Sequence, residues 1–297
     1  MKDLTAAFLL PVFNAEKTIE RTIKSILEQD YKEFKLIIIE NGSTDHTREI
    51  IKKSQENDYR IILYNLDNAS LTHALCFGIK KIKEDLILRI DADDVCASNR
   101  LSKTIEYMTN NPEVDISYTD FQDIYKNKSH LFITPNKITY RDILYKNLIA
   151  HSTYCLRRKS LEKYNMNYSG IEGKNKYYGP SQDLMLISSG INNFKFNVSK
   201  IEGTKVLIYK NKYSISKISY VLQKRNAAKI LFVNSLNIFT YSNKLKDWIL
   251  GFTCLIINLS RLIYHKTNLK VIMKIIEANK GFKDRKEAID YSFILSI

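Results

Sequence analysis

Three carboxylates occupy four consecutive positions of this 297-residue chain, directly after a short apolar run. Asp91, Asp93 and Asp94 follow the sequence LILRI, which has the composition of a buried strand. Carboxylates at this density repel one another unless a cation neutralises them. Such oxygen ligands suit Mg²⁺ or Mn²⁺, which proteins bind through one or two carboxylates together with substrate phosphates. The alternative is an acidic turn in which Asp94 caps a helix that starts near Ser98.

Two further polar segments follow apolar runs, at residues 11–14 and 40–45. The side chains of the second could reach a ligand at the edge of a sheet, and its glycine permits a tight turn. In the alternative interpretation, Ser43 or Asp45 simply caps the next helix. The first segment matches neither GxGxxG nor the GxxxxGK phosphate loop, which disfavours a dinucleotide oxidoreductase and a P-loop enzyme.

Strands and helices must alternate to position these segments. Apolar runs predict strands, and helical spacing predicts the segments between them. The predicted strands are 6–12, 34–39, 60–66 and 86–90, and the predicted helices are 18–29, 44–55 and 70–83. Near-continuous apolar strands separated by helices indicate a parallel sheet covered on both faces, with ligands at the carboxyl ends of the strands.

Basic charge is concentrated towards the end of the chain. The sequence has 46 Lys and Arg against 32 Asp and Glu, and from Lys205 onward the balance is 17 against 5. This asymmetry indicates an anionic partner, either membrane lipid or nucleic acid. Lysine supplies 35 of the 46 basic residues, which disfavours nucleic acid because its recognition favours the forked guanidinium of Arg.

The pattern from residue 216 onward is helical and contains two charge-free stretches, 230–243 and 248–260. Both are shorter than the roughly 20 apolar residues that cross a bilayer. In the second stretch an apolar face is predicted at Trp248, Phe252, Leu255, Leu259 and Leu262, a polar face at Asn258, Arg261 and His265, and flanking bases at Lys244, Lys246, Lys266, Lys270 and Lys274. This pattern favours a helix lying in the interface of an anionic membrane. The alternative is a helical hairpin that packs on the rest of the chain or on a second subunit, as in a homo-oligomer.

Four scattered cysteines form no CxxC pair and have no partnered histidines, which argues against a zinc module or a disulfide framework. They fit a reducing compartment. The first apolar run is shorter than that of a signal peptide and leads directly into a helical pattern, so we interpret it as the first strand of a cytosolic domain.

Four segments, in this order and spacing, resemble the family 2 glycosyltransferases: PVFNAEKTIERTIKSILEQDY, LIIIENGSTDHT, LTHALCFGI and LILRIDADDV. These are inverting nucleotide-sugar enzymes. The resemblance implies an α/β protein of the GT-A fold, with a mostly parallel central sheet and helices on both faces. It implies a catalytic domain over residues 1–215, divided into a nucleotide-sugar half (1–115) and an acceptor half (116–215). The residue pattern adds a C-terminal helical extension, the basic region 216–297.

The resemblance also assigns residues to the donor site. Those expected on the nucleotide-sugar side are Pro11, Phe13, Asn14, Glu40, Asp67, Asp91 and Ala92. Asp93 is expected to bind Mg²⁺ or Mn²⁺ directly, with Asp91 nearer the ribose or as a second ligand. Two positions depart from the family pattern: Glu40 stands where relatives usually carry Asp, and Leu75-Cys76 replaces a pair with a polar contact to the nucleotide.

The implied reaction is a single displacement at the anomeric carbon, in which a carboxylate removes the proton of the acceptor hydroxyl while the metal neutralises the departing diphosphate. The sequence GPSQDL resembles the Glu-Asp motif of the family, with Gln182 in place of Glu. Asp183 is therefore the predicted base, and the alternative is an Asp placed to complement a helix dipole. Gln182 and His151 are assigned to the acceptor side, although His151 could equally be a structural histidine.

Together these features predict a hexosyl- or N-acetylhexosaminyltransferase that uses a UDP-sugar. The expected acceptor is a saccharide or lipid-linked saccharide of a bacterial surface polysaccharide or lipooligosaccharide, at the cytoplasmic face of the plasma membrane. One alternative is a nucleotidyltransferase, which usually has a Gly-rich basic loop after its first strand. The other is a non-catalytic nucleic-acid-binding protein, whose basic residues should alternate with aromatic ones. We expect no nucleic acid partner.

Overall fold

The computed structural model describes residues 4–67, 70–126, 128–144, 147–171, 181–210, 220–241, 245–264, 267 and 271–272. Its contacts divide the chain into two compact units. The first unit comprises Met1–Lys137, Ile149–Lys163 and Asn197–Asn211, and the second comprises Ile138–Leu148, Tyr164–Phe196 and Lys212–Ile297. The predicted boundaries at 115 and 215 divide the chain by function, and residues 116–215 contribute to both units.

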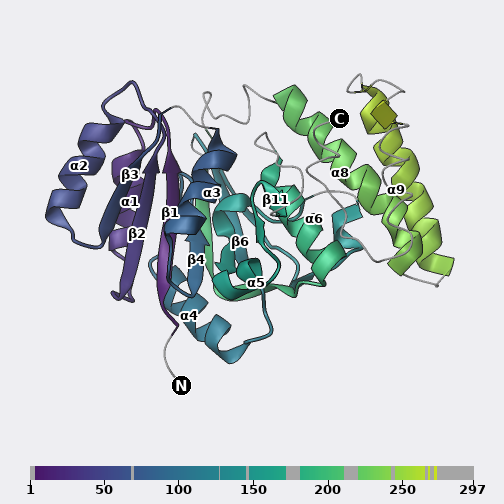
Figure 1. Ribbon diagram of the computed structural model, residues 1–297, viewed down its shortest axis with the longest axis horizontal. Coiled ribbons are helices and arrows are strands. Elements are labelled where there is room, and N and C mark those ends of the chain that lie inside the picture. Colours follow the sequence, from purple (N-terminus) through teal and green to yellow (C-terminus); the bar gives the residue numbers. More distant parts are fainter. Residues whose placement is uncertain are drawn as a thin grey trace. The chain divides into compact units, whose positions relative to one another are not determined.

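A central sheet forms the first unit (Figure 1). Its strands are β1 (Ala6–Val12), β2 (Phe34–Glu40), β3 (Ile61–Asn65), β4 (Leu86–Arg89), β5 (Val95–Cys96), β6 (Ile116–Tyr125), β7 (Lys128–Phe132), β9 (Cys155–Arg157) and β12 (Val198–Tyr209). The strand order is β3-β2-β1-β4-β9-β6-β12-β5. Strand β7 pairs antiparallel with residues 121–125 of β6. The four predicted strands are confirmed as β1 to β4, and they run parallel.

Strand β1 shows why this part of the sheet is parallel and covered on both faces. Every residue of β1 is buried, so both faces need apolar cover. On one face, Phe8 and Leu10 belong to the same cluster as residues of α1 (Ile19–Leu27), α2 (Thr47–Asn57) and α4 (Arg100–Asn110). On the other face Leu9 lies against α3 (Leu71–Lys81), where a Cβ on Gly78 would meet the Leu9 side chain.

The predicted helices are confirmed, with small shifts at their ends. Helix α3 begins where predicted, because the Ser70 hydroxyl accepts a hydrogen bond from the His73 N–H at 3.2 Å. Helix α2 begins at Thr47, three residues later than predicted. Asp45 explains the shift, since its carboxylate accepts hydrogen bonds from the Thr47 and Glu16 N–H groups.

Antiparallel pairing extends the sheet beyond β4. Strand β9 pairs antiparallel with both β4 and β6, and β6 pairs parallel with β12. Strands β6 and β12 therefore point the same way as β1 to β4, and their carboxyl ends lie on the same edge of the sheet. Two short elements complete the first unit, η2 (His151–Thr153) and α5 (Arg158–Lys163). The short strand β8 (Lys137–Ile138) lies where the chain passes from the first unit to the second.

Helices dominate the second unit. Its elements are η1 (Asp142–Leu144), β10 (Met166–Asn167), β11 (Gly170–Ile171), α6 (Gln182–Phe194), α8 (Tyr220–Tyr241) and α9 (Leu245–Tyr264). Leu184 and Met185 of α6 share one apolar cluster with Leu231 and Val233 of α8 and with Leu262 of α9. The helical character predicted after residue 216 is confirmed for α8 and α9.

The predicted faces of α9 are wrong at Asn258 and Leu262, whereas Trp248 and Phe252 are exposed as a lipid-facing stripe requires. Its buried residues are Asp247, Gly251, Cys254, Asn258 and Leu262, so Asn258 is packed inside and Leu262 does not belong to an exposed stripe. The exposed large apolar residues are Leu245, Trp248, Ile249, Leu250, Phe252, Ile256, Ile263 and Tyr264. Of the predicted flanking lysines, only Lys246 lies within the described residues, and it is exposed.

Buried polar contacts explain which face of α9 packs. The Asn258 amide donates hydrogen bonds to the carbonyl oxygens of Leu144 (2.8 Å) and Leu231 (3.2 Å) and to the Ser235 hydroxyl (2.9 Å). Buried Asp247 accepts a hydrogen bond from the Arg141 guanidinium at 2.8 Å. Polar groups are buried at low cost only when they are paired in this way.

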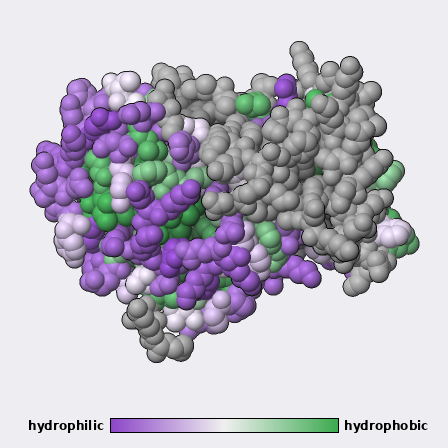
Figure 2. All heavy atoms as spheres, viewed as in Figure 1, coloured by the Kyte–Doolittle hydropathy of each residue, from purple (hydrophilic) through white to green (hydrophobic). Residues whose placement is uncertain are grey.

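Within the described residues, α9 is the one helix long and apolar enough to cross a membrane, with 20 residues and a mean hydropathy of 1.3 over its best window. Only 28% of that window is buried. Figure 2 shows hydrophobic atoms exposed on the side of the second unit where α9 lies in Figure 1. The helix therefore has one face packed on its own unit and an apolar outer face.

Candidate active site

The carboxylates predicted to bind a metal lie at the carboxyl edge of the sheet, in the turn between β4 and β5. We call residues 91–94 the acidic loop. Two main-chain oxygens of this loop are held by α1: the Thr22 hydroxyl lies 3.0 Å from the Ala92 carbonyl oxygen and 2.8 Å from that of Asp94. The Asp94 carboxyl is buried and caps no helix, so the predicted capping alternative is wrong.

A single hydroxyl connects two of the three carboxyls. The Ser152 oxygen lies 2.7 Å from Asp91 Oδ2 and within hydrogen-bond distance of Asp94 Oδ2, and it accepts the Asp91 N–H at 3.2 Å. One hydroxyl proton cannot serve two carboxylates. Burial, followed by the charges of Asp91 and Asp93, raises the pKa of Asp94 well above its usual value. Protonated Asp94 can therefore donate to Ser152, which in turn donates to Asp91.

The Arg89 side chain keeps Asp91 charged. Arg89 is fully buried in β4, and its Nη2 donates to Asp91 Oδ1 at 2.5 Å. Burial by itself would raise the pKa of Asp91, but the Arg89 charge and the Ser152 hydroxyl outweigh it, so the pKa is lowered. Among the described residues, Arg89 Nε and Nη1 have no hydrogen-bond partner, and Asp91 forms the ion pair with this buried cation.

The environment of Asp93 suits a bound cation. Burial, followed by the negative charge of Asp91, raises the pKa of the Asp93 carboxyl to about 6. A divalent cation would relieve this repulsion and would complete its ligand set with phosphate oxygens and water. No group of three or more His, Cys, Asp or Glu side chains among the described residues is arranged to hold a metal by itself. The neighbouring carboxylates of Asp91 and Asp93 are oxygen ligands of the kind that bind a divalent cation together with substrate phosphates.

The two nucleotide-side segments predicted from the sequence are joined to each other. Asn14 has a positive φ of 46°, and its amide oxygen accepts the Thr44 N–H at 2.8 Å. The Asn14 N–H in turn donates to the Ser43 hydroxyl at 3.0 Å. Gly42 has a φ of 78°, which confirms the predicted tight turn. These contacts fix residues 11–14 and 40–45 as one surface at the carboxyl edge of β1 and β2.

Glu40 is placed at this edge but is fully buried. Its carboxylate accepts hydrogen bonds from Arg48 at 2.9 and 2.6 Å and from the Ser43 N–H at 2.6 Å. Burial by itself would raise the pKa of Glu40, but the Ser43 and Arg48 contacts outweigh it and the pKa is lowered. Glu40 thus organises the loop, and its contact with the base stays a prediction.

The other nucleotide-side residues lie on the same edge. Pro11 is buried at the end of β1, whereas Phe13 is 41% exposed just beyond it. Asp67 is exposed after β3, and half-buried Ala92 offers its carbonyl to Thr22. The first unit therefore brings together all the residues predicted for the nucleotide-sugar side, and their individual contacts with a donor stay predictions.

His151 belongs to the first unit, next to Ser152 in η2. Burial, followed by the charge of nearby Arg89, lowers the pKa of His151 well below its usual value, so the ring is neutral. Its ring makes an edge contact with Tyr154 at 5.4 Å. Its predicted role on the acceptor side stays a prediction.

Asp183 and Gln182 lie in the second unit, in the first turn of α6. Asp183 Oδ2 accepts a hydrogen bond from the Asn147 amide at 2.9 Å, and Gln182 is buried. The residue before them, Ser181, has a positive φ of 74°, and its hydroxyl donates to the Gln223 carbonyl of α8 at 3.0 Å. The N-terminus of α6 is thus fixed by α8 within the same unit.

The sequence did not identify Ser152, Thr22 or Arg48 as parts of the site, because each acts through a contact with a residue distant in sequence or on another element. A signal existed only for Arg89. It is the charged residue of an otherwise apolar strand, and a charge in such a position needs a buried partner.

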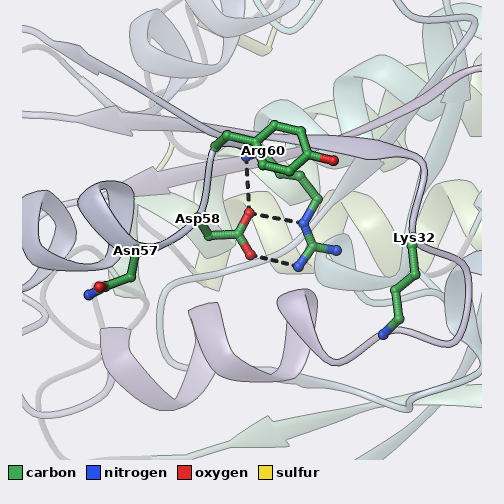
Figure 3. Close-up of a pocket in the computed structure, with 5 residues that line it drawn as sticks. Lys32, Asn57, Asp58 and Arg60 are labelled. Carbon is green, nitrogen blue, oxygen red and sulfur yellow. Dashed lines mark hydrogen bonds and ion pairs between the residues drawn. The ribbon is translucent and has the colours of Figure 1, made fainter.

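A separate pocket lies at the opposite, amino edge of β2 and β3 (Figure 3). It is lined by Lys32, Asn57, Asp58, Tyr59 and Arg60. Within it, Asp58 pairs with Arg60 at 2.7 Å, and the Arg60 guanidinium also lies 4.6 Å from the Phe34 ring. These contacts hold the starts of two strands, and none of the predicted site residues lies there.

Residues 8–164, more than half of the chain, match the domain named Glycosyl transferase family 2. The chain belongs to this family. This membership decides against the nucleotidyltransferase and nucleic-acid-binding alternatives.

Two curated Escherichia coli relatives illustrate the similarity. The O-antigen biosynthesis glycosyltransferase WbnJ is 32% identical over 160 residues, which is 52% of this chain and 62% of WbnJ. The UDP-Glc:alpha-D-GlcNAc-diphosphoundecaprenol beta-1,3-glucosyltransferase WfgD is 29% identical over 170 residues, 57% of this chain and 66% of WfgD. The chain thus matches a little under two thirds of the length of these relatives.

Solved structures extend the similarity of this family 2 glycosyltransferase to nearly its whole length. Staphylococcus aureus TarS 1–349 in complex with UDP-GlcNAc has a TM-score of 0.63 at 14% identity and covers 99% of this chain and 91% of its own. The mannosyltransferase PcManGT from Pyrobaculum calidifontis, in complex with GDP-Man and Mn²⁺, has a TM-score of 0.60 at 12% identity, covering 99% and 86%. At this identity they show the fold alone, and the predicted GT-A fold is confirmed.

Proposed function

We propose that this family 2 glycosyltransferase transfers a sugar from a nucleotide-sugar, with UDP as the nucleotide, in a reaction that depends on Mg²⁺ or Mn²⁺. The observation that carries the proposal is the different placement of the three carboxyls in the acidic loop. Asp94 is used internally by Ser152, whereas Asp91 and Asp93 remain at the sheet edge where a diphosphate would lie. The UDP complex of TarS and the Mn²⁺ complex of PcManGT support the donor class and the cation for proteins of this fold.

In the proposed donor site, the residues of this chain would have the following roles. Asp93 holds the cation, with Asp91 oriented beside it by Arg89 and Ser152. A bound cation supplies Lewis-acid stabilisation of the charge that develops on the leaving diphosphate. The joined surface of residues 11–14 and 40–45 receives the nucleoside.

Asp183 is the proposed base. The acceptor hydroxyl transfers its proton to the Asp183 carboxylate as its oxygen forms a bond to the anomeric carbon. The bond from that carbon to the diphosphate oxygen breaks, and the nucleoside diphosphate leaves with the electron pair. A single displacement of this kind inverts the configuration. The Asn147 amide orients the carboxylate by donating a hydrogen bond to Oδ2 at 2.9 Å.

The proposed acceptor is a saccharide or lipid-linked saccharide of a bacterial surface polysaccharide, and the proposed location is the cytoplasmic face of the plasma membrane. The printed name of WfgD describes a diphosphoundecaprenol-linked acceptor, and that of WbnJ describes O-antigen biosynthesis. A lipid-linked acceptor brings the enzyme to the bilayer surface. The apolar outer face of α9 and the basic C-terminal third of the chain support contact with anionic lipid.

The test compares UDP-, GDP- and dTDP-sugars for Mn²⁺-dependent thermal stabilisation and donor hydrolysis. We expect UDP-sugars to stabilise the wild type only with Mn²⁺ present. Asp93→Asn should remove this stabilisation and abolish transfer, because the amide carries no charge for the cation. The matched control is Glu49→Gln, which neutralises an exposed carboxylate on α2 and should change neither result. Undiminished wild-type activity after exhaustive chelation would exclude the metal-dependent mechanism.

A further inference from the structure

The acidic loop is held by two elements that are far apart in sequence. From α1, Arg21 Nη2 donates a hydrogen bond to the Asp93 carbonyl oxygen at 2.8 Å. From the end of β12, the Tyr209 N–H donates to Asp94 Oδ1 at 3.3 Å. Both contacts lie within the first unit. The main chain of Asp93, the expected metal ligand, is therefore fixed by a side chain outside the loop.

Arg21 and Tyr209 also contact each other. The Arg21 Cζ atom lies 3.6 Å from the centre of the Tyr209 ring, the shortest distance of its kind among the described residues. A planar guanidinium stacked on an aromatic ring has few orientations left, so its N–H groups point in fixed directions. Here one of them points at the Asp93 carbonyl oxygen. The Tyr209 ring thus orients the group that holds the acidic loop.

The exposure of Arg21 argues that this contact serves more than folding. Arg21 is exposed on α1, and exposed pairs of this type contribute little to stability. A comparison within the same unit is the Arg60–Phe34 pair, at 4.6 Å, in which Arg60 is also held by Asp58 and by the Leu27 carbonyl (Figure 3). That pair lies at the amino edge of the sheet, away from the acidic loop.

We propose that Arg21 and Tyr209 are positioning residues that hold the acidic loop in the geometry needed to bind the divalent cation of the donor complex, an inference that rests on the proposed function. Without the stack, the guanidinium no longer holds the Asp93 carbonyl oxygen in one orientation, and the Asp93 carboxylate must be ordered when the cation binds. Residues that orient a metal ligand change metal affinity when they are removed, even though they make no bond to the metal.

The test measures the Kd of Mn²⁺ for the full chain by electron paramagnetic resonance, with UDP present. Tyr209→Leu and Arg21→Gln should each raise this Kd about tenfold, the low end of the effect of losing a partner of a metal ligand. The Kd of the double variant should be about equal to the higher of the two single-variant Kd values, because both changes break the same contact. Tyr209→Phe should bind as the wild type does, since it keeps the ring and the main-chain N–H.

The control is Arg60→Gln, which breaks the other arginine–aromatic pair and should lower the melting temperature without changing the Kd of Mn²⁺. An unchanged Kd in both Tyr209→Leu and Arg21→Gln would overturn the inference alone, provided that the wild type binds Mn²⁺ and UDP. Failure of the wild type to bind them would overturn the proposed function and this inference together. If Tyr209→Leu does not fold, the exposed Arg21→Gln decides.

Discussion

Three aspartates of the same loop differ in what their surroundings allow. Asp91 is kept charged by Arg89, Asp94 is buried and shares Ser152 with Asp91, and Asp93 is raised in pKa to about 6 by burial and by the charge of Asp91. Three identical side chains within four positions therefore differ in pKa: that of Asp91 is lowered, whereas those of Asp93 and Asp94 are raised. The difference arises from neighbours on β4 and η2 together with the mutual repulsion of the carboxylates within the loop.

At Asp183, the exchange Asp183→Asn keeps the size of the side chain but leaves no group that can accept a proton at neutral pH. We expect donor binding close to that of the wild type and a turnover lowered by at least about a hundredfold, the lower end of general-base contributions. Single-turnover transfer and UDP binding measure the two effects separately. Asp142→Asn, which changes a carboxylate of η1 in the same unit, is the control and should keep its turnover. Equal turnover in Asp183→Asn would assign the base to another carboxylate, such as Glu172, which lies outside the described residues.

The Glu40–Arg48 pair predicts a pH dependence of stability. The pKa of Glu40 is lower in the folded protein than its usual value of 4.5, so the carboxylate stabilises the fold above that pH. As the pH falls through the folded-state pKa, Glu40 takes up a proton and this contribution is lost. Glu40→Gln should therefore lower the free energy of unfolding by about 1–3 kcal/mol at pH 7.

Urea unfolding of both proteins between pH 7 and pH 3 measures this difference. It should be constant above about pH 5 and should shrink in more acidic solution. The control is Glu49→Gln, at an exposed position of α2, which should match the wild type at neutral pH. A difference that does not vary with pH would contradict the assigned charge of Glu40.

At the scale of elements, α8 and α9 form part of the unit that carries the proposed base. Leu184 and Met185, the two residues that follow Asp183, pack in a cluster with α8. Ser181, which starts α6, is hydrogen-bonded to the Gln223 carbonyl. Removal of the chain after residue 216 would expose this cluster, so α8 does not act as a detachable anchor.

Asn258→Ala tests how specifically α9 is packed. The exchange removes the amide that donates to the Leu144 carbonyl, and that buried oxygen loses this partner. We expect a loss of about 1–3 kcal/mol in the free energy of unfolding, the usual cost of an unsatisfied buried polar group. Ser260→Ala, at an exposed position of the same helix, should lower the free energy of unfolding by less than half as much. Equal stability of the two variants in urea unfolding would mean that the buried contacts of α9 contribute nothing.

At the scale of the whole molecule, the proposed contact with lipid would use the apolar outer face of α9 and the basic charge of the C-terminal third. Phe252 and Ile256 are 60% and 52% exposed, one turn apart on that face. Apolar burial contributes roughly 25 cal/mol per Å² and is hardly affected by salt, whereas attraction of lysines to anionic lipid is screened. Binding to anionic vesicles should therefore weaken at high salt without vanishing.

The double variant Phe252→Gln with Ile256→Gln should weaken vesicle binding by at least about tenfold. It removes most of the free energy gained when the two apolar side chains are buried in the lipid. Sedimentation with vesicles of defined anionic lipid content measures this. The control is Ile133→Gln, which removes an equally exposed apolar side chain from the first unit and should bind as the wild type does. Unchanged vesicle binding, together with a change in oligomeric state, would assign the outer face of α9 to a second copy of the chain.

The sequence alone determined the features that depend on short-range patterns. Strands β1 to β4 and the helices between them follow from runs of apolar residues and from helical spacing, and the positions of Ser70 and Gly42 follow from their local chemistry. The acidic loop was recognisable because three carboxylates adjoin in sequence. These features need no knowledge of which distant segments meet.

Tertiary structure decided what the local pattern left open. Ser152 and Tyr209 reach the acidic loop only because β9 and β12 join the sheet of β4, and pairings across 58 and 115 residues leave no periodic signal. On α9, helical spacing placed Asn258 on a polar face with Arg261, yet it is buried because the Leu144 carbonyl and the Ser235 hydroxyl supply its hydrogen bonds. A polar side chain is placed by the partners that satisfy it, and those partners are known only once the chain has folded.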